Sequence, residues 1–119
     1  MEKILFLIND APYGTEKMFN ALRLAINLLK QHKDEVEVKV FLMGDAVTGI
    51  LTDQELPKGY YNIETMLRSV INQGGEVKAC GTCANARGIE NLKLIDGAEI
   101  STMNDLSQWT VEADKVFTF

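Results

Sequence analysis

The sequence predicts an α/β fold in which a parallel sheet is covered by helices on both faces. Near the N-terminus Ile4–Ile8 is an unbroken apolar run, which is typical of a strand buried on both faces. Strand-like and helix-like segments then alternate along the chain, and right-handed helical crossovers are the usual connections between parallel strands. The chain has 119 residues and no linker, repeat or low-complexity segment, so we expect one domain, residues 1–119.

The expected elements follow from apolar periodicity and from the turn residues between the periodic segments. In chain order they are a strand at 4–8, a helix from 16 to about 29, a strand at 36–42, a short helix at 46–51, a loop at 52–60, a helix at 63–71, a strand at 76–79, a strand at 98–101, a helix ending near 113 and a strand at 115–119.

Short polar side chains mark the starts of these helices, because they accept hydrogen bonds from the free N–H groups of a first turn. The candidate caps are Thr15, Asp45, Asn62 and, for the last helix, Thr102 or Asn104. A pair of glycines at 74 and 75 is expected to end the helix at 63–71.

The first expected helix carries more apolar surface than one sheet can cover. Its main stripe runs from Met18 to Leu29 at helical spacing, and Leu24 and Leu28 lie off that stripe. A second buried contact is the economical explanation, so we expect a homo-oligomer.

The balance of charge argues against a nucleic-acid partner. Lys and Arg number 12 and Asp and Glu number 17, which gives a formal net charge of −5, whereas binding to phosphate requires a basic surface. The apolar run at 4–8 is shorter than the roughly seven residues of a signal peptide core or the about twenty of a membrane helix. We therefore expect a soluble, cytoplasmic protein with no membrane partner.

Cys80 and Cys83 form a Cys-x-x-Cys motif directly after the strand expected at 76–79. Ligands of open parallel sheets bind outside the carboxyl ends of the strands, which selects the loops 9–14, 43–45 and 80–87. A thiol followed by Gly81 and a helical turn faces unpaired N–H groups that stabilise a thiolate. Cys80 is the candidate reactive thiol and Cys83 a candidate resolving thiol, while small buried hydrophobic residues remain the alternative role for both.

Further residues of the three loops are candidates to support this sulfur site. Gly81 lets another group approach closely, the Thr82 hydroxyl can donate to the sulfur, and the long side chain of Arg87 can reach toward it. Asp10 and Asp45 are candidate general bases whose turn-forming and capping roles are equally good explanations. The full set of supporting candidates is Asn9, Asp10, Tyr13, Met43, Asp45, Gly81, Thr82 and Arg87.

No cofactor and no metal is expected at this site. A structural zinc ion takes four ligands, and His32 is the single histidine, which we expect to be a solvated residue at the end of the first helix. The glycine-rich phosphate-binding motifs are absent. Thioredoxin-type exchangers place Cys-x-x-Cys after their first central strand, whereas here it follows several α/β units.

Four stretches resemble the DsrE/DsrF-like family, and most closely its YchN-like branch. They are 9–15 with 20–25, 40–47, 77–83 with 86–89, and 108–110 with 113–116. The resemblance implies a three-layer α/β/α sandwich with a central, mainly parallel sheet of about five strands in a flavodoxin-like arrangement. It also implies a trimer or hexamer without a cofactor.

In sulfur-relay members of the family a persulfide-carrying cysteine occupies the position of Cys80, eight residues before Gly88. Cys83 departs from those relay subunits and resembles the YchN-like branch. The leading hypothesis is a persulfide carrier or sulfurtransferase subunit with sulfur donor and acceptor proteins as partners. The alternatives are a non-enzymatic oligomeric module that binds a ligand or partner, and a Cys80/Cys83 thiol–disulfide redox protein.

Overall fold

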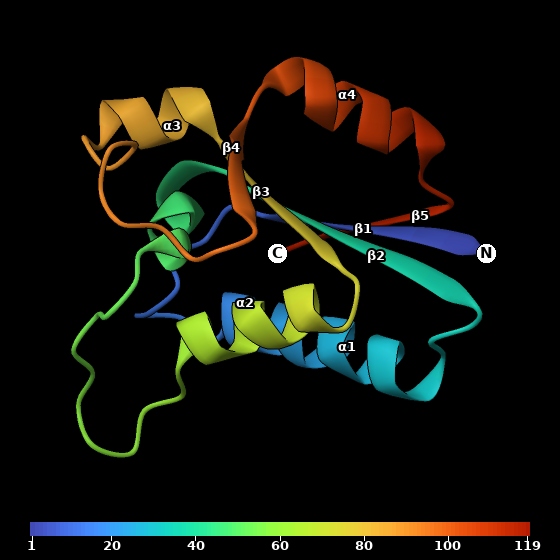
Figure 1. The fold of residues 1–119 in the computed structure, drawn as a ribbon, viewed down its shortest axis with the longest axis horizontal. Helices are drawn as coiled ribbons and strands as arrows, with labels where there is room; N and C mark the ends of the chain where they lie inside the picture. Colours follow the sequence, from blue (N-terminus) through green and yellow to red (C-terminus); the bar gives the residue numbers. More distant parts are fainter.

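The centre of the protein is a five-stranded sheet, seen in a computed structural model that describes residues 1–119 (Figure 1). All its neighbouring strands are parallel, and their spatial order is β4-β3-β2-β1-β5. The strands are β1 Glu2–Ile8, β2 Val36–Leu42, β3 Glu76–Cys80, β4 Ala98–Ser101 and β5 Lys115–Thr118.

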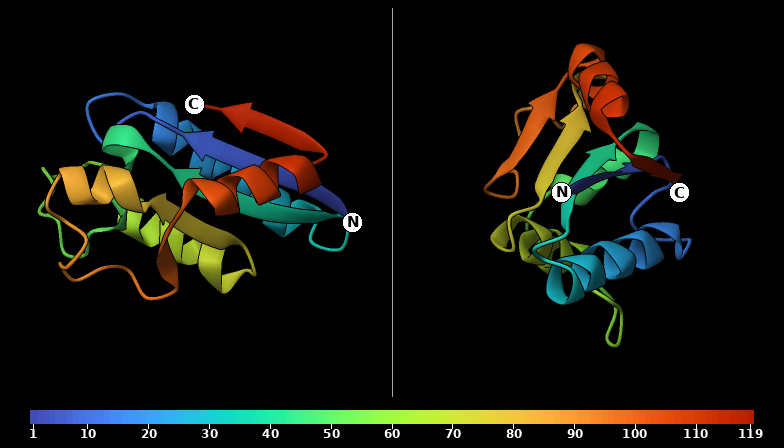
Figure 2. Two further views of the ribbon diagram at one scale, coloured as in Figure 1. Left: turned by 90° about the horizontal axis from the view of Figure 1, so that it is seen from above. Right: turned by 90° about the vertical axis from the view of Figure 1, so that its right-hand side faces the viewer.

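Helices cover both faces of this sheet, so the expected three layers are confirmed (Figures 1 and 2). They are α1 Lys17–Gln31, the 3-10 helix η1 Gly44–Ile50, α2 Ile63–Asn72, α3 Gly81–Ala86 and α4 Met103–Glu112. Helices α1 and α2 lie on one face and α4 on the other, while α3 stands at the carboxyl end of β3. The strand order differs from the 2-1-3-4-5 order of flavodoxin-like sheets. None of these helices combines the length and apolar character that a membrane span requires.

Strand β1 is buried on both faces, as its unbroken apolar run predicts. Ile4, Leu5, Phe6 and Ile8 are each at most 4% exposed, because neighbouring strands flank β1 on both sides and helices lie above and below it. Burial of this kind stabilises a fold by roughly 1.5–3 kcal/mol for each large apolar side chain. The same core receives the buried stripe of α1.

Two of the expected helix caps are wrong. Helix α1 begins at Lys17 with Glu16 at its N-cap, and Thr15 lies outside the helix, where its hydroxyl accepts from the Lys17 N–H at 3.3 Å. The Tyr61 hydroxyl donates to the Thr15 carbonyl at 3.0 Å, which holds that residue out of the helix. Asp45 lies within η1 rather than before it, and its carboxylate pairs with Arg87 instead of capping that helix.

The caps of the two later helices are confirmed. The Asn62 side chain accepts a first-turn N–H of α2 at 3.1 Å, and the Thr102 hydroxyl does the same for α4 at 3.3 Å, so Asn104 is not the cap. Gly74, with φ of +95°, ends α2, and the N–H of Gly75 returns to the last turn of the helix. Both glycines therefore act as the sequence predicts.

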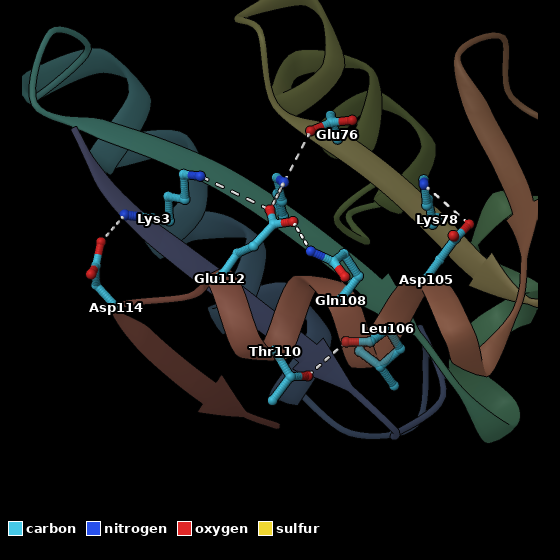
Figure 3. Close-up of polar contacts among 10 residues, drawn as sticks. Lys3, Glu76, Lys78, Asp105, Leu106, Gln108, Thr110, Glu112 and Asp114 are labelled. Carbon is cyan, nitrogen blue, oxygen red and sulfur yellow. Dashed lines mark hydrogen bonds and ion pairs between the residues drawn. The ribbon is translucent and has the colours of Figure 1, made fainter.

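The layer between α4 and the sheet is charged as well as apolar (Figure 3). Trp109 is 6% exposed and meets the Phe41 ring edge-on at 6.0 Å between centroids. The ammonium groups of Lys39 and Lys78 lie 5.1 and 4.8 Å from the centre of its ring. Cation–π contacts of this kind and the burial of Leu106 hold α4 on the sheet.

Two carboxylates of α4, Asp105 and Glu112, neutralise the lysines beneath it, and Asp105 lies 3.3 Å from Lys78. Glu112 lies 3.6 Å from Lys39 and 3.9 Å from Lys3, and it accepts a hydrogen bond from Gln108 at 2.6 Å (Figure 3). The bond from Gln108 and the two nearby ammonium groups hold the pKa of Glu112 below its ordinary value. The ionised form is therefore favoured in the folded protein over the unfolded chain.

Replacing Glu112→Gln tests whether this charge stabilises the fold. A lowered folded-state pKa means that the carboxylate contributes above its unfolded value and loses that contribution as the pH falls through the folded value. The urea midpoint of E112Q is expected to lie below that of the wild type at pH 7, and the difference is expected to shrink below about pH 4.5. The exposed, unpaired Glu99 supplies the control E99Q, and a difference that persists unchanged at low pH would contradict a charge effect.

Candidate functional site

Cys80 is both the last residue of β3 and the N-cap of α3. Its sulfur accepts a hydrogen bond from the Cys83 N–H at 3.4 Å, the contact that an aspartate or serine oxygen makes at other helix starts. The extended backbone of Cys80, with φ of −61° and ψ of 120°, lets the strand turn directly into the helix. Cys80 as a residue is 6% exposed and is therefore buried.

The hydrogen bond to the sulfur explains what the Cys-x-x-Cys spacing does here. Residue 83 is the third residue of α3, and its N–H is one of those left without a partner in the first turn of a helix. An N–H donor stabilises a thiolate more than a thiol, because its partial positive charge faces the anion. Both cysteines are free thiols in the structure.

Gly81 is required by packing rather than by an open approach for a ligand. A Cβ atom at this position would lie 3.0 Å from the Ser101 carbonyl oxygen and 3.2 Å from Cγ2 of Ile100. The close approach that the sequence predicts is therefore made by the protein's own strand β4. Since Cys80 and Ser101 are partners in the β3–β4 register, β4 supports the sulfur site from one side.

Arg87 and Asp45 form an ion pair that connects the end of α3 to η1. Nε and Nη2 of Arg87 donate to Oδ1 of Asp45 at 3.0 and 2.8 Å, and Nη1 donates to the Cys83 carbonyl at 3.1 Å. Helix α3 ends before Arg87, so this residue does not continue the helix face toward Cys80, and no hydrogen bond joins it to that sulfur. Arg87 therefore contacts the backbone of α3 rather than the sulfur.

The candidates from the loop after β1 have other partners. The Asp10 carboxylate lies 3.5 Å from the Lys17 ammonium. The Tyr13 hydroxyl accepts the first N–H of α2 at 3.0 Å, and its ring lies 5.6 Å from the Tyr61 ring. The Asn9 N–H pairs with the C-terminal residue of the chain. None of these side chains is hydrogen-bonded to Cys80.

The remaining candidates lie nearer to the core or to solvent. Met43 is half-buried and packs on the hydrophobic core, and Gly44 brings the loop after β2 to the Asn9 carbonyl, 3.3 Å from where a Cβ would stand. Thr82 is exposed, and its hydroxyl makes no hydrogen bond to the sulfur. Cys80 lines none of the four surface cavities.

Two features of this end of the sheet were missed by sequence reasoning. One is the Asp45–Arg87 pair, whose members are 42 residues apart in the chain. The other is a cluster of four aromatic rings formed by Tyr13, Phe19, Tyr60 and Tyr61. The adjacent tyrosines just before the helix at 63–71 were the available signal for the cluster.

Metal-ligating side chains are not grouped in this structure. No three His, Cys, Asp or Glu side chains lie together as a metal site. His32 is the exposed C-cap of α1, with Nδ1 3.0 Å from a Glu35 carboxylate oxygen, as expected of a solvated helix end.

The model of the DsrE/DsrF-like family matches residues 2–119. The chain belongs to the DsrE/DsrF-like family. Protein YchN of Escherichia coli (strain K12) is 50% identical over 119 residues, which cover both chains completely. An uncharacterized protein of Methanopyrus kandleri is 40% identical over 119 residues, or 100% of this chain and 95% of that relative.

Solved structures of the DsrE/DsrF-like fold agree with this assignment. The crystal structure of the E. coli YchN protein superposes with a TM-score of 0.94 at 50% identity, covering 100% of both chains. A protein of unknown function from Methanobacterium thermoautotrophicum gives a TM-score of 0.73 at 18% identity, again over 100% of both chains, and shows the shared fold alone. The resemblance to the family and to its YchN-like branch is confirmed.

Replacing Arg87→Gln tests whether the ion pair with Asp45 orders the start of α3. Without the guanidinium the Cys83 carbonyl loses a donor, so amide exchange at Cys83 is expected to become roughly three- to tenfold faster. Hydrogen exchange followed by NMR or mass spectrometry measures this change. The matched control Arg68→Gln removes a similar pair on α2 and is expected to leave that amide unchanged. Equal protection in R87Q and the wild type would show that other contacts alone order α3.

Proposed function

We propose that this protein carries sulfane sulfur as a persulfide on Cys80 and passes it to an acceptor thiol. The observation that carries the proposal is the hydrogen bond from the Cys83 N–H to the Cys80 sulfur at the carboxyl end of a parallel strand. An N–H donor at this atom favours the anionic sulfur that both halves of the reaction require. Membership of the DsrE/DsrF-like family, which is associated with sulfur relay, supports the same chemistry.

The transfer consists of two thiolate attacks. The Cys80 thiolate attacks the outer sulfur of a persulfide on the donor, so that a new S–S bond forms, the donor S–S bond breaks and the donor leaves as a thiolate. An acceptor thiolate then attacks the outer sulfur of the Cys80 persulfide, and the Cys80 thiolate is regenerated. Electrons and sulfur atoms balance without a cofactor.

Cys83 adds a second possible fate for the persulfide. Its thiolate can attack Sγ of Cys80, which releases hydrosulfide and forms a Cys80–Cys83 disulfide that an external thiol must reduce. Cys83 is half-buried in the first turn of α3, one turn from the sulfur that its own N–H contacts. We therefore propose Cys83 as a resolving thiol.

Intact-mass measurement after treatment with glutathione persulfide tests the carrier role. The wild type is expected to gain about 32 Da, the mass of one sulfur atom, and to lose it again with dithiothreitol. This reversal matters, because a sulfinic acid adds nearly the same mass but resists thiols. The adduct is expected to last longer in Cys83→Ser, which lacks the resolving thiol, and to be absent from Cys80→Ser.

The same samples separate the alternative functions. No reversible gain of mass in either the wild type or Cys83→Ser would contradict the carrier role and favour a module with structural cysteines. Loss of about 2 Da in the wild type, with no sulfur adduct in Cys83→Ser, would instead indicate a thiol–disulfide redox protein. A sulfur adduct retained in Cys80→Ser would place the persulfide on Cys83 and would contradict the role proposed for Cys80.

We also propose that the protein self-associates, as the trimer or hexamer that its family resemblance implies. A groove of about 300 Å³ lies beside the edge strand β5, and its apolar lining includes Leu24, Leu28 and Phe117. Leu24 of α1 and Phe117 of β5 are 40% and 36% exposed in the single chain, and Leu28 beside them is half-buried. A second copy that covered them would also shield the edge of the sheet.

Sedimentation of Leu24→Lys tests this surface. The wild type at about 100 μM is expected to sediment as an assembly, and L24K is expected to shift toward the single chain, because the new ammonium cannot be buried without a partner. Leu92→Lys is the matched control, since Leu92 is also exposed but lies in the connection before β4. A monomeric wild type, or an assembly unaffected by L24K, would contradict the proposed surface.

A further inference from the structure

A cavity of about 490 Å³ opens at the carboxyl end of the sheet, apart from the cysteines. It is formed where the loop after β1 meets the end of the long connection between η1 and α2. Its lining residues are Gly14, Thr15, Glu16, Gly59, Tyr60 and Tyr61. Gly14 and Gly59 have φ of +100° and +90°, so both walls turn sharply beside the cavity.

Two tyrosine rings form the firm wall of this cavity. Tyr61 stacks on Phe19 with 4.2 Å between ring centres, and its hydroxyl donates to the Thr15 carbonyl at 3.0 Å. Both the ring and the hydroxyl of Tyr61 are therefore held by other residues. The Tyr60 ring lies 6.0 Å from it and is 54% exposed, which is unusual for a large aromatic side chain. The cavity therefore has one aromatic ring held by two contacts, Tyr61, and one exposed ring beside it, Tyr60.

The charge in this cavity is negative and uncompensated. Glu16 is the one charged residue among those that line it, and its carboxylate makes no ion pair or hydrogen bond. The neighbouring Lys17 is directed to Asp10, at 3.5 Å. Burial raises the pKa of Tyr61, and the carboxylate of the nearby Glu16 adds to that rise.

The position of the cavity also suits a ligand site. Open parallel sheets bind ligands in the loops outside the carboxyl ends of the strands. The loop after β1 supplies Gly14, Thr15 and Glu16 to the cavity.

We propose that this cavity binds a small alkylammonium ion, which lies against the faces of Tyr60 and Tyr61 with Glu16 as its counter-charge. Aromatic faces with a nearby carboxylate recognise cations that carry methyl groups, because such ions give up little hydration and touch the rings directly. A single carboxylate is too few for calcium, which takes six to eight oxygen ligands. An anion is disfavoured, since Glu16 already occupies the start of α1.

Choline and its neutral isostere 3,3-dimethylbutan-1-ol form a matched pair of probes for this site. They have the same shape and hydroxyl and differ in the charge on the central atom. Titrations at constant ionic strength, followed by the amide NMR signals of Gly14 and Gly59, are expected to show saturable choline binding below about 50 mM. The isostere is expected to bind about three- to tenfold more weakly, the share owed to cation–π and ion-pair attraction.

Two variants locate the binding in the cavity. Glu16→Gln and Tyr60→Leu are each expected to weaken choline binding about three- to tenfold, and neither residue belongs to the buried core. Glu37→Gln removes the same charge from an exposed, unpaired position on β2 and is expected to bind choline as the wild type does. Equal binding of the isostere, no saturable shift at Gly14 and Gly59, or unchanged binding in both E16Q and Y60L would overturn the proposal.

Discussion

The hydrogen bond from the Cys83 N–H to the sulfur of Cys80 fixes the passage from β3 into α3. A strand that turns into a helix within one residue needs an acceptor at the N-cap, and here that acceptor is a sulfur atom. The capping contact and the chemistry of the thiol are therefore the same interaction. Cys80→Ser removes the reactive sulfur but leaves a side-chain oxygen that can cap α3, and Cys83→Ser keeps the backbone N–H that donates to residue 80, so both variants alter the thiols while retaining the groups of the cap.

A capping contact at Cys80 is useful only if α3 stays in place, and α3 is too short to be stable by itself. It has six residues, whereas isolated helices shorter than about 12–15 residues are marginal in water. Two contacts from other elements hold it: β4 packs against Gly81, and Asp45 holds Arg87, which in turn donates to the Cys83 carbonyl. The geometry around the sulfur is thus set by β4 and by η1, which follows β2, the other strand beside β3.

Local patterns predicted the elements well because their causes are local. The apolar run of β1, the caps Asn62 and Thr102 and the position of Cys80 at a strand end all follow from neighbouring residues. Partners across the fold could not be read in this way. Asp45 has the character of a cap, and only the folded chain brings Arg87 to it, across 42 residues of sequence. The choice of strand order, with β5 beside β1, likewise depends on where α4 crosses the sheet.

Ser101 connects the sulfur site to the charged layer under α4. It is the register partner of Cys80, and its hydroxyl donates to Asp105 at 2.6 Å, a bond that, with Lys78, holds the pKa of that carboxyl below its ordinary value. Protonation of Asp105 therefore weakens this connection only in acid. Near neutral pH Asp105 stays ionised, so the connection between Ser101 and α4 is intact under the conditions in which sulfur transfer is measured.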